Sequence, residues 1–373
     1  MPATAVATDR GRSGQAIGVW LLTCCAMVLA IVVIGGVTRL THSGLSMVEW
    51  KPLIGVLPPL SELEWQRVFG LYQATPEYRA VNAGMSLSEF QGIFWWEWFH
   101  RLFAHLIGVV FVGPFLWFWA RGAIDRRLMP RLLGLLVLGG LQGVVGWLMV
   151  ASGLVDRPSV SHYRLAAHLS TAVLIFTLML WQALDLLQPE ARSGAVAPAR
   201  SLRRHLVLVL VLALVTLVWG ALVAGLHAGL IYNTFPLMNG TVLPGEAWFY
   251  RPALINLVEN PPTVQFCHRW LALTTGTVVL IYWVRTRLAG AALTAGTRRI
   301  ANLLGAMVVV QISLGITTLL LAVPVPVAVG HQGGAFVLLA LLVWALHELR
   351  VPKEKRAGAL PLDPTGALRP QTP

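Results

Sequence analysis

Charged residues are scarce in this 373-residue chain: Asp, Glu, Lys and Arg together make up 12%, against 56% apolar residues. An ordinary soluble domain carries about 25% charged residues. The low charged fraction therefore excludes such a domain and indicates an integral membrane protein. Acidic residues are the scarcest, at 16 against 28 basic ones, which gives a net charge of +12.

Four further features are missing. No cysteine falls in a predicted external loop, since Cys24 and Cys25 lie in the first predicted helix and Cys267 begins the sixth, so we expect no disulfide. No basic stripe interleaved with aromatic residues is present, which argues against nucleic acid as a partner. No small-residue cleavage site follows the first apolar run, so we expect a retained helix and not a signal peptide. A long Arg- and Ser-rich transit segment is also missing, which favours a bacterial inner membrane.

Long apolar runs dominate the rest of the chain. Runs of about 20 residues with few charges are typical of membrane-spanning helices. We therefore predict an all-α integral membrane protein with eight transmembrane helices. They are expected over residues 17–40, 97–120, 131–152, 163–184, 205–227, 265–284, 300–322 and 328–348.

The basic residues predict the orientation of these helices. If the N-terminus is on the inner side, most of the 28 basic residues fall in the N-terminal segment, the inner loops or the C-terminal tail. Excess Lys and Arg on the cytoplasmic side is the rule for such proteins. We therefore predict that both termini are cytoplasmic and that the basicity reflects topology.

Recurring motifs indicate an internal duplication of a four-helix unit. A His-x-Gly-Leu phrase, a Gln-x-x-x-Gly phrase and a His-x-x-x-Ala phrase each occur twice, beginning at His42 and His227, Gln142 and Gln311, and His168 and His331. Because each unit has an even number of spans, the two halves should be related by an axis along the membrane normal. The predicted parts are a first bundle over 1–187 with a long external loop at 42–96, a cytoplasmic linker over 188–202, a second bundle over 203–350 and a polar tail over 351–373.

Four histidines fall at the outer ends of the even-numbered predicted helices, two in each half at one depth. They are His100, His168, His268 and His331. Two neutral imidazoles on separate helices can hold an iron porphyrin between them as axial ligands. A lone histidine in such a place is more often an interfacial hydrogen-bonding residue, but these four recur through the repeat. We therefore predict a bis-histidine heme site in each half.

The other histidines lack this support. His105 lies about 140° round its helix from His100, so it cannot face the same ligand. Interfacial, packing or loop-capping roles are expected, or no role at all, for His42, His105, His162, His205, His227 and His347. The alternative for the repeat pair His42 and His227 is that they line the entrance to each pocket.

The two halves differ at one chemically important position. Residues 97–101 read Glu-Trp-Phe-His-Arg, and residues 265–269 read Gln-Phe-Cys-His-Arg. Glu97 shares a helix face with His100, at i and i+3. Because Gln265 cannot exchange a proton or neutralise a developing cation, we predict that the chemistry belongs to the first half, with Glu97 as the catalytic residue. The alternative for Glu97 is a carboxylate that complements the helix dipole.

An arginine follows the histidine of each phrase, at the outer boundary of the membrane. The propionates of a bound porphyrin would meet water at this level, and a guanidinium suits paired contacts to carboxylates. Arg101 and Arg269 are therefore candidate propionate-binding residues. The alternative is that they anchor their helices among lipid headgroups.

These motifs together resemble the heme A synthase family of bacteria and mitochondria. The resemblance covers nearly the whole chain and rests on the Glu-x-x-His-Arg phrase combined with Tyr-Asn-Thr-Phe-Pro-Leu-Met-Asn-Gly at 232–240. Residues 35–46, His268-Arg269 and His331-Gln332 add to it. Many relatives carry a cysteine pair in the first external loop, and this chain carries none. Its longer, acidic loop resembles the mitochondrial and alphaproteobacterial branch.

The resemblance implies eight helices in two pseudo-symmetric four-helix bundles. It implies heme b held by His268 and His331, a substrate site at His100 and His168, and an essential Glu97. The implied activity is oxidation of the C8 methyl of heme O to a formyl group, giving the heme A of cytochrome oxidases.

Two other functional classes are the alternatives to a heme A synthase. A di-heme cytochrome b that oxidises quinol would use the same four histidines but would have no need for Glu97. A transporter would place polar sites near the membrane midplane, whereas these histidines gather at one surface. The candidate partners are heme O, membrane lipid, an upstream heme O synthase and cytochrome oxidase assembly proteins. The electron acceptor is not assigned, and a homo-oligomer stays open.

Overall fold

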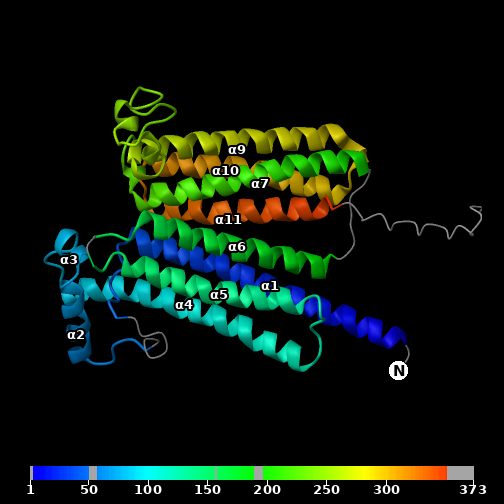
Figure 1. Cartoon of the computed structure of the whole chain (residues 1–373), viewed down its shortest axis with the longest axis horizontal. Coiled ribbons are helices and arrows are strands. Elements are labelled where there is room, and N and C mark those ends of the chain that lie inside the picture. Colours follow the sequence, from blue (N-terminus) through cyan, green and yellow to red (C-terminus); the bar gives the residue numbers. More distant parts are fainter. Residues whose placement is uncertain (1–2, 50–56, 156–157, 189–195, 351–373) are drawn as a thin grey trace, which may run out of the picture.

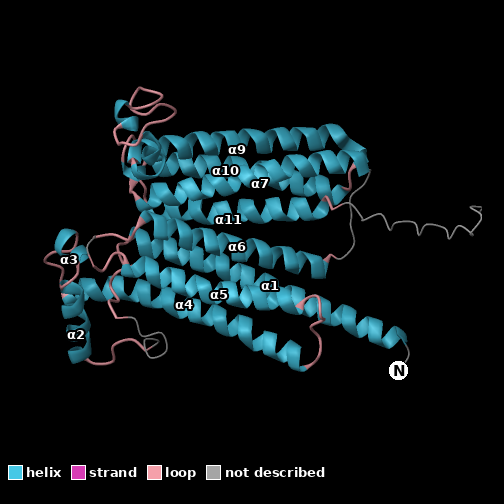
Figure 2. Ribbon diagram, in the orientation of Figure 1, coloured by secondary structure: helices cyan, strands magenta, loops and turns pink. Residues whose placement is uncertain are grey.

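The computed structural model describes residues 3–49, 57–155, 158–188 and 196–350, which are helical and contain no β-strand (Figure 2). The predicted tail at 351–373 and residues 189–195 of the predicted linker lie outside the described residues. The long helices run roughly parallel (Figure 1). They are α1 (Ala3–Leu40), α4 (Leu87–Ala120), α5 (Met129–Ala151), α6 (His162–Leu187), α7 (Val196–Gly225), α9 (Pro261–Ala289), α10 (Ala295–Leu320) and α11 (Val325–Glu348).

Short helices occupy the connections. The segment between α1 and α4 contains α2 (Glu62–Gln73) and α3 (Pro76–Ala80), and the segment between α7 and α9 contains η2 (Ala228–Leu230), η3 (Gly245–Trp248), η4 (Ala253–Ile255) and α8 (Asn256–Glu259). One further turn, η5 (Gly290–Ala292), links α9 to α10. The end of the molecule that carries α2, α3 and η2–η4 is called the loop end, and the opposite end the basic end (Figure 1).

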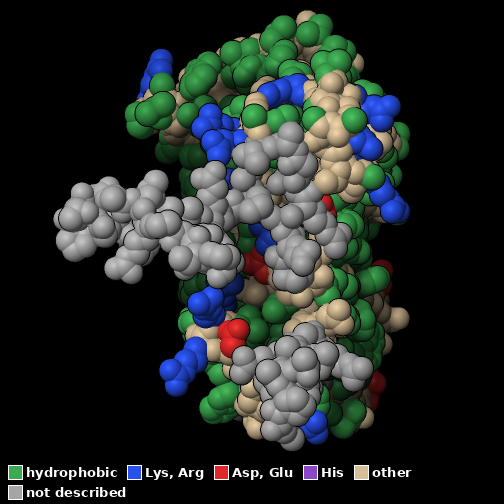
Figure 3. All heavy atoms as spheres, turned by 90° about the vertical axis from the view of Figure 1, so that its right-hand side faces the viewer, with side chains coloured by type: hydrophobic (Ala, Val, Ile, Leu, Met, Phe, Trp, Pro, Cys, Tyr) green, Lys and Arg blue, Asp and Glu red, His purple; other side chains and the backbone are tan. Residues whose placement is uncertain are grey.

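Charge separates the two ends. Arginines of the basic end lie in the α4–α5 connection and near the ends of α7, α9, α10 and α11: Arg121, Arg126, Arg127, Arg203, Arg204, Arg285, Arg287, Arg298, Arg299 and Arg350. Figure 3 shows Lys and Arg side chains spread over this end, with few acidic ones. The acids Glu62, Glu64 and Glu77 lie at the loop end, on α2 and α3.

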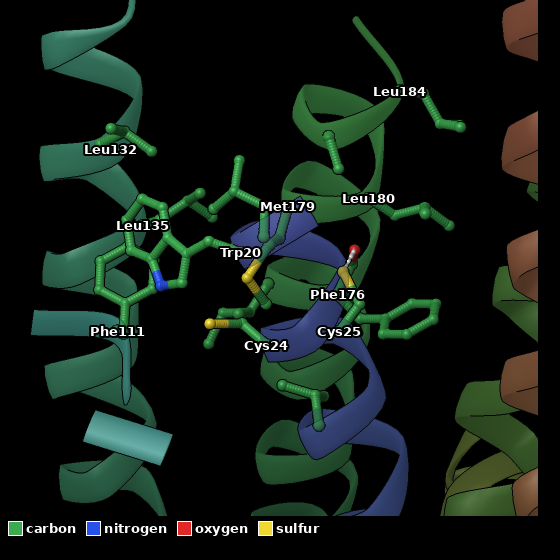
Figure 4. Packing of buried hydrophobic residues seen from close by; sticks show 14 of the residues in the cluster. Trp20, Cys24, Cys25, Phe111, Leu132, Leu135, Phe176, Met179, Leu180 and Leu184 are labelled. Atoms are coloured by element: carbon green, nitrogen blue, oxygen red, sulfur yellow. Dashed lines mark hydrogen bonds between the residues drawn. The ribbon is translucent and has the colours of Figure 1, made fainter. Parts of the chain in front are cut away.

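The helices pack in two groups that share a seam. In the first, α1 packs against α4 and α6, and α5 packs against α4 and α6; in the second, α7 and α10 each pack against α9 and α11. Contacts of α6 with α7 and α11, and of α1 with α11, join the groups. Figure 4 shows part of the first core, where Trp20, Cys24 and Cys25 of α1 meet Phe176 and Met179 of α6. Both of these cysteines are buried free thiols.

Seven helices among the described residues are long and apolar enough to cross a membrane, namely α1, α4, α5, α6, α7, α10 and α11. They match seven of the eight predicted spans. The eighth, α9, has polar groups near both ends, with His268 and Arg269 at one and Arg285 and Arg287 at the other. It nevertheless packs along α7 and α10.

The predicted helix boundaries place the histidines too near the helix starts. Helix α4 begins at Leu87 and not at 97, because Ser86 and Glu89 form a reciprocal capping box there. His100 therefore lies about 20 Å along its helix, at 1.5 Å per residue. His168, His268 and His331 lie about two turns into α6, α9 and α11, which begin at His162, Pro261 and Val325.

Candidate functional site

The structure brings the rings of His268 of α9 and His331 of α11 close together inside the second group of helices. Their ring centroids are 6.5 Å apart, and the ring planes are nearly perpendicular, at 85°. Nδ1 of His268 lies 3.2 Å from the carbonyl oxygen of Thr216, and Nδ1 of His331 lies 3.2 Å from that of Gln311. A neutral imidazole that donates its Nδ1–H to a carbonyl keeps a lone pair on Nε2. His268 is therefore set to offer Nε2 as a ligand. His331 is set likewise in the tautomer that donates to the carbonyl of Gln311, whose amide nitrogen also lies 3.2 Å from the same Nδ1.

A glycine on the neighbouring helix makes each of these contacts sterically allowed. Gly220 lies one turn after Thr216 on α7, and a Cβ atom added to it would come within 3.0 Å of Cε1 of His268. Gly315 lies one turn after Gln311 on α10, and its added Cβ would come within 2.8 Å of Cε1 of His331. Each imidazole thus occupies the space that a side chain would fill. We call each arrangement a glycine cradle.

The first half repeats both cradles with altered ring orientations. An added Cβ at Gly146 of α5 would lie 2.8 Å from Cε1 of His168, as Gly315 does for His331. At Gly35 of α1 it would lie 3.1 Å from Nε2 of His100, whereas Gly220 faces Cε1 of its histidine. Nδ1 of His168 is buried and has no hydrogen-bond partner. The two histidine pairs therefore share positions but differ in how their nitrogens are held.

A glutamine braces the second histidine of each pair. The amide nitrogen of Gln142 donates to the carbonyl of His168 at 3.2 Å, and that of Gln311 donates to the carbonyl of His331 at 2.9 Å. The amide oxygens of both glutamines are buried without a partner. The Gln-x-x-x-Gly phrase, which the sequence presented only as a repeat, thus supplies both the brace and the cradle.

The second-half pair fits the axial ligands of an iron porphyrin. Metal–imidazole bonds of about 2 Å place the centroids of two axial rings roughly 6 Å apart. The separation of His268 and His331, 6.5 Å between centroids, agrees with this spacing. The orientation of their Nδ1 atoms, which leaves Nε2 for the metal, agrees as well.

Glu97 is a buried carboxylate that accepts hydrogen bonds from α4 itself and from the segment after α1. Its Oε1 accepts from Nη2 of Arg101 at 2.6 Å. Its Oε2 accepts from the hydroxyl of Ser46 at 2.7 Å and from the backbone N–H of Met47 at 2.8 Å. Three donors, one of them a guanidinium, therefore converge on this carboxylate. Sequence reasoning missed Ser46 and Met47, although both belong to or adjoin the quoted motif at 35–46.

Gln265 occupies the position that matches Glu97, but its amide nitrogen donates hydrogen bonds where the carboxylate of Glu97 accepts them. Its amide nitrogen donates to the carbonyls of Ala228 and Ile231, at 2.7 and 2.5 Å. Its oxygen accepts from Nη2 of Arg269 at 3.0 Å. An amide can donate and a carboxylate cannot, so the loop after α7 presents carbonyls where the loop after α1 presents donors. Each side chain, Glu97 or Gln265, thus matches the hydrogen-bonding groups of the loop that it contacts.

The two arginines hold the same loops. Nη2 of Arg101 donates to the carbonyl of Met47 at 2.9 Å, and Nη2 of Arg269 donates to the carbonyl of Tyr232 at 2.5 Å. Nη1 of Arg269 also donates to the carbonyl of Thr234 at 2.8 Å. Both guanidiniums therefore tie a segment of the loop end to the helix that carries a histidine. Their contact with propionates stays a prediction.

Four other histidines lie away from the two pairs at the loop end. His42 and His227 end α1 and α7 in left-handed conformations, at φ of 52° and 53°, and their rings stack at 6.5 Å. His105 is exposed, with Nδ1 2.7 Å from the carbonyl of Arg101. His162 is buried, with Nε2 3.6 Å from a carboxylate oxygen of Glu259. None of these contacts involves His100, His168, His268 or His331.

The sequence assigned no role to the two histidines of the basic end, but each belongs to a hydrogen-bond network. Nδ1 of His205 lies 2.8 Å from Nη1 of Arg285, between α7 and α9. Nε2 of His347 lies 3.1 Å from Oδ1 of Asp185, between α11 and α6. The apolar periodicity of these helices gave no sign of either partner.

The fold and the repeated cradles define a multi-helix membrane protein with two partly buried histidine pairs and one buried glutamate beside the first pair. The chain matches the COX15-CtaA family model, described as cytochrome oxidase assembly protein, over residues 18–343 and belongs to that family. The resemblance inferred from the motifs is thereby confirmed.

Relatives of known name agree. The chain is 54% identical over 346 residues to the heme A synthase of Rhodospirillum centenum. The aligned residues cover 92% of this chain and 90% of the relative. It is 50% identical over 354 residues to that of Paramagnetospirillum magneticum, covering 93% and 99%. It is 49% identical over 334 residues to that of Nitrosospira multiformis, covering 90% and 93%.

Proposed function

We propose that this chain oxidises the C8 methyl of heme O to a formyl group and so produces heme A. The observation that carries the proposal is the contrast between Glu97 and Gln265 at matched positions of two otherwise similar histidine pairs. A buried, ion-paired carboxylate lies beside one pair only. The high identity to heme A synthases over most of the chain supports the same activity.

The proposed architecture is eight transmembrane helices in two pseudo-symmetric four-helix bundles, over 1–187 and 203–350, joined by a linker at 188–202. The tail at 351–373 and the N-terminus are assigned to the cytoplasm of a bacterial inner membrane. Matching cradles at Gly35 and Gly220, and at Gly146 and Gly315, support the symmetry. Packing of α9 along α7 and α10 supports the eighth span. The arginines at the basic end support the orientation.

The second half is proposed to hold heme b through His268 and His331. A heme bound there supplies a one-electron redox centre. The protein's contribution is to fix both Nδ1 atoms on backbone carbonyls, which sets the ring orientation and raises the basicity of the ligating nitrogen. Gln265 beside this pair offers no ionisable group, in keeping with an electron-transfer or structural role.

The first half is proposed to take heme O between His100 and His168. The unbonded Nδ1 of His168 and the altered seating of His100 suit a pair that must receive and release its ligand. Glu97 shares a helix face with His100, so its carboxylate is available to the porphyrin edge. The methyl would be oxidised in two steps: water supplies the oxygen atom of the alcohol, and the alcohol is then oxidised to the formyl group. Each step would release two protons and two electrons, and the electrons would pass to an external electron acceptor. Glu97 accepts a proton or stabilises developing positive charge, while Arg101 and Ser46 keep its carboxylate in place.

Heme O from an upstream heme O synthase and the assembly of cytochrome oxidase are the proposed biological context. The competing interpretation, a di-heme cytochrome b that oxidises quinol, leaves the buried Glu97 and its three donors without a purpose. The synthase interpretation uses them.

Reversed-phase chromatography of the hemes extracted from purified protein tests the proposal. The protein would be co-expressed with a source of heme O. Hydroxymethyl or formyl heme in the extract, besides heme b, is the expected result. Heme b alone, together with quinol oxidation by the purified protein, would replace the proposal with the electron-transfer cytochrome.

A further inference from the structure

A groove of about 510 Å³ runs between α7 and α9 at the basic end, far from the histidine pairs. Helix α7 lines it with Ser201, Arg204, His205 and Leu208, and helix α9 with Val278, Ile281 and Arg285. We call it the basic groove. Its lining includes two arginines and no acidic residue that could neutralise them.

The basic groove changes polarity along the helix axes. Leu208 lies one turn further from the basic end than Arg204, and Ile281 lies one turn further than Arg285, so each is about 6 Å deeper. Leu208 is 52% exposed and Ile281 49% exposed. Two guanidiniums therefore stand at the mouth of the groove, above apolar side chains that open sideways. A phospholipid has the same order of polarity, with a charged headgroup above hydrocarbon.

The guanidinium of Arg285 is fixed by neutral groups. Its Nη2 donates to the hydroxyl of Ser201 at 2.7 Å, and its Nη1 lies 2.8 Å from Nδ1 of His205. Nε2 of His205 lies 3.0 Å from the carbonyl of Val278, which makes Nε2 the donor and Nδ1 the acceptor. An arginine has five N–H groups, so three remain for an anion. Among the described residues, the ion pairs include neither Arg285 nor Arg204.

The internal repeat provides a comparison within the molecule. In the register that matches His42 with His227, Trp20 takes the place of His205. The matched bond is kept, because Nε1 of Trp20 donates to the carbonyl of Val110 at 2.8 Å. The framework of the groove is therefore common to both halves, and only the chemistry of its lining differs.

That difference extends over the whole mouth of the basic groove. In the matched registers the first half has apolar residues where the second half has polar ones: Ala16 for Ser201, Val19 for Arg204, Trp20 for His205 and Trp117 for Arg285. If these arginines only contributed to the excess of positive charge on one side of the membrane, no serine or histidine would be needed to hold one guanidinium in place. The four replacements together build a site for an anion.

We propose that the basic groove binds one anionic phospholipid in the leaflet at the basic end. The guanidiniums of Arg204 and Arg285 contact its phosphate, and Leu208 and Ile281 contact its acyl chains. Basic pockets between membrane helices are known to select anionic headgroups, and guanidinium matches phosphate geometry. This inference is independent of the proposed catalytic function.

Native mass spectrometry of the full chain in detergent, titrated with phosphatidylglycerol or phosphatidylcholine, tests the proposal. The expected result is one tightly bound phosphatidylglycerol and weaker, unsaturated binding of phosphatidylcholine. Arg204→Gln should weaken the tight site about fivefold, and Arg204→Gln combined with Arg285→Gln roughly 25-fold, since each cation near an anionic lipid contributes about a factor of five. Arg204→Gln removes no hydrogen bond that fixes α7 to α9, so its effect is separate from folding.

The matched controls are Arg203→Gln and Arg287→Gln, which remove an exposed arginine of the same helices outside the groove. Both should keep the tight site. Equal loss of phosphatidylglycerol in these controls would overturn the proposal, and so would equal affinity for phosphatidylcholine. Displacement of the bound lipid by inorganic phosphate at comparable concentration would also overturn it, because the site would then be selective for free phosphate.

Discussion

Glu97 and Arg101 form an ion pair one turn apart on α4, with 2.6 Å between Oε1 and Nη2. The carboxylate side chain is 4% exposed and the guanidinium side chain 17%. In the second half the matched pair, Gln265 and Arg269, is joined at 3.0 Å without an acid. The same framework therefore carries a buried charge pair in one half and a neutral contact in the other.

The first prediction concerns the arginines of these two pairs. Arg101→Gln should destabilise the protein by about 3–5 kcal/mol, because it leaves a buried carboxylate without its cation. Arg269→Gln should cost less, about 1–3 kcal/mol, because Gln265 is neutral. Thermal unfolding of the two variants in the same detergent measures the difference. Equal losses of unfolding temperature would mean that Glu97 is not held as an ion in the folded protein.

The glycine cradles predict a steric effect that is specific to position. Gly315→Ala places a Cβ 2.8 Å from the ring of His331 and should displace it, at a cost of about 1–3 kcal/mol. Gly330→Ala, on the same helix as His331, meets only an ordinary contact at 3.9 Å and serves as the control. The bis-histidine absorption spectrum and heme b content of purified protein should fall for Gly315→Ala alone.

A matched pair of variants makes the corresponding test in the first half. Gly146→Ala meets His168 at 2.8 Å, whereas Gly143 on the same helix has nothing within 4 Å of an added Cβ. Turnover of heme O should fall in Gly146→Ala and stay at the wild-type level in Gly143→Ala. Unchanged turnover in both would show that His168 does not need its cradle.

Most of the fold follows from apolar runs, and most of the candidate site follows from the repeat. Seven predicted spans match candidate membrane helices, and His268 and His331 lie together as their recurrence predicted. The start of α4 could not be placed from hydropathy, because its first turns, around Ser86 and Glu89, are amphipathic and extend beyond the apolar run.

Contacts between distant segments were the part that the sequence could not supply. Ser46 and Met47 reach Glu97 only because the chain after α1 folds over α4, and no periodicity encodes that turn. Gly146 and Gly315 were visible in the sequence only as the ends of the repeated Gln-x-x-x-Gly phrase. Only the packing of α5 on α6 and of α10 on α11 shows that Gly146 and Gly315 receive imidazoles.

The third prediction concerns the seam at the basic end. Oδ1 of Asp185 on α6 accepts from Nε2 of His347 at 3.1 Å and from Nη1 of Arg350 at 2.5 Å, which ties α6 to the end of α11. Asp185→Ala should therefore lower stability by about 1–3 kcal/mol, a range that allows for its partial exposure. Asp185→Asn keeps an acceptor and should lose less. A double-mutant cycle with Arg350→Gln should show coupling, and additive losses would contradict the link.

The fourth prediction is a pH dependence of the segment that contains α2 and α3. Glu77 on α3 is buried, and burial raises its pKa to about 7; the hydroxyl of Tyr72, 3.2 Å away, opposes this rise and the charge of Glu97 adds to it. Because the folded pKa exceeds the unfolded value, the stabilisation is complete below about pH 4 and is lost as pH rises through 7.

Hydrogen exchange of α2 and α3, corrected for intrinsic rates, measures this effect. Protection should fall between about pH 5 and pH 8 in the wild type and stay level in Glu77→Gln, whose amide does not ionise. The same slope in both proteins would assign the pH dependence to another group.

The central claim is that Glu97 makes the first histidine pair the catalytic one. The most direct measurement is the composition of hemes extracted from Glu97→Gln, compared with the wild type and with Glu62→Gln, an exposed acid on α2 that undergoes the same change. Glu97→Gln should retain heme but accumulate heme O or its alcohol, whereas Glu62→Gln should yield formyl heme as the wild type does. Full formyl production by Glu97→Gln would contradict the central claim.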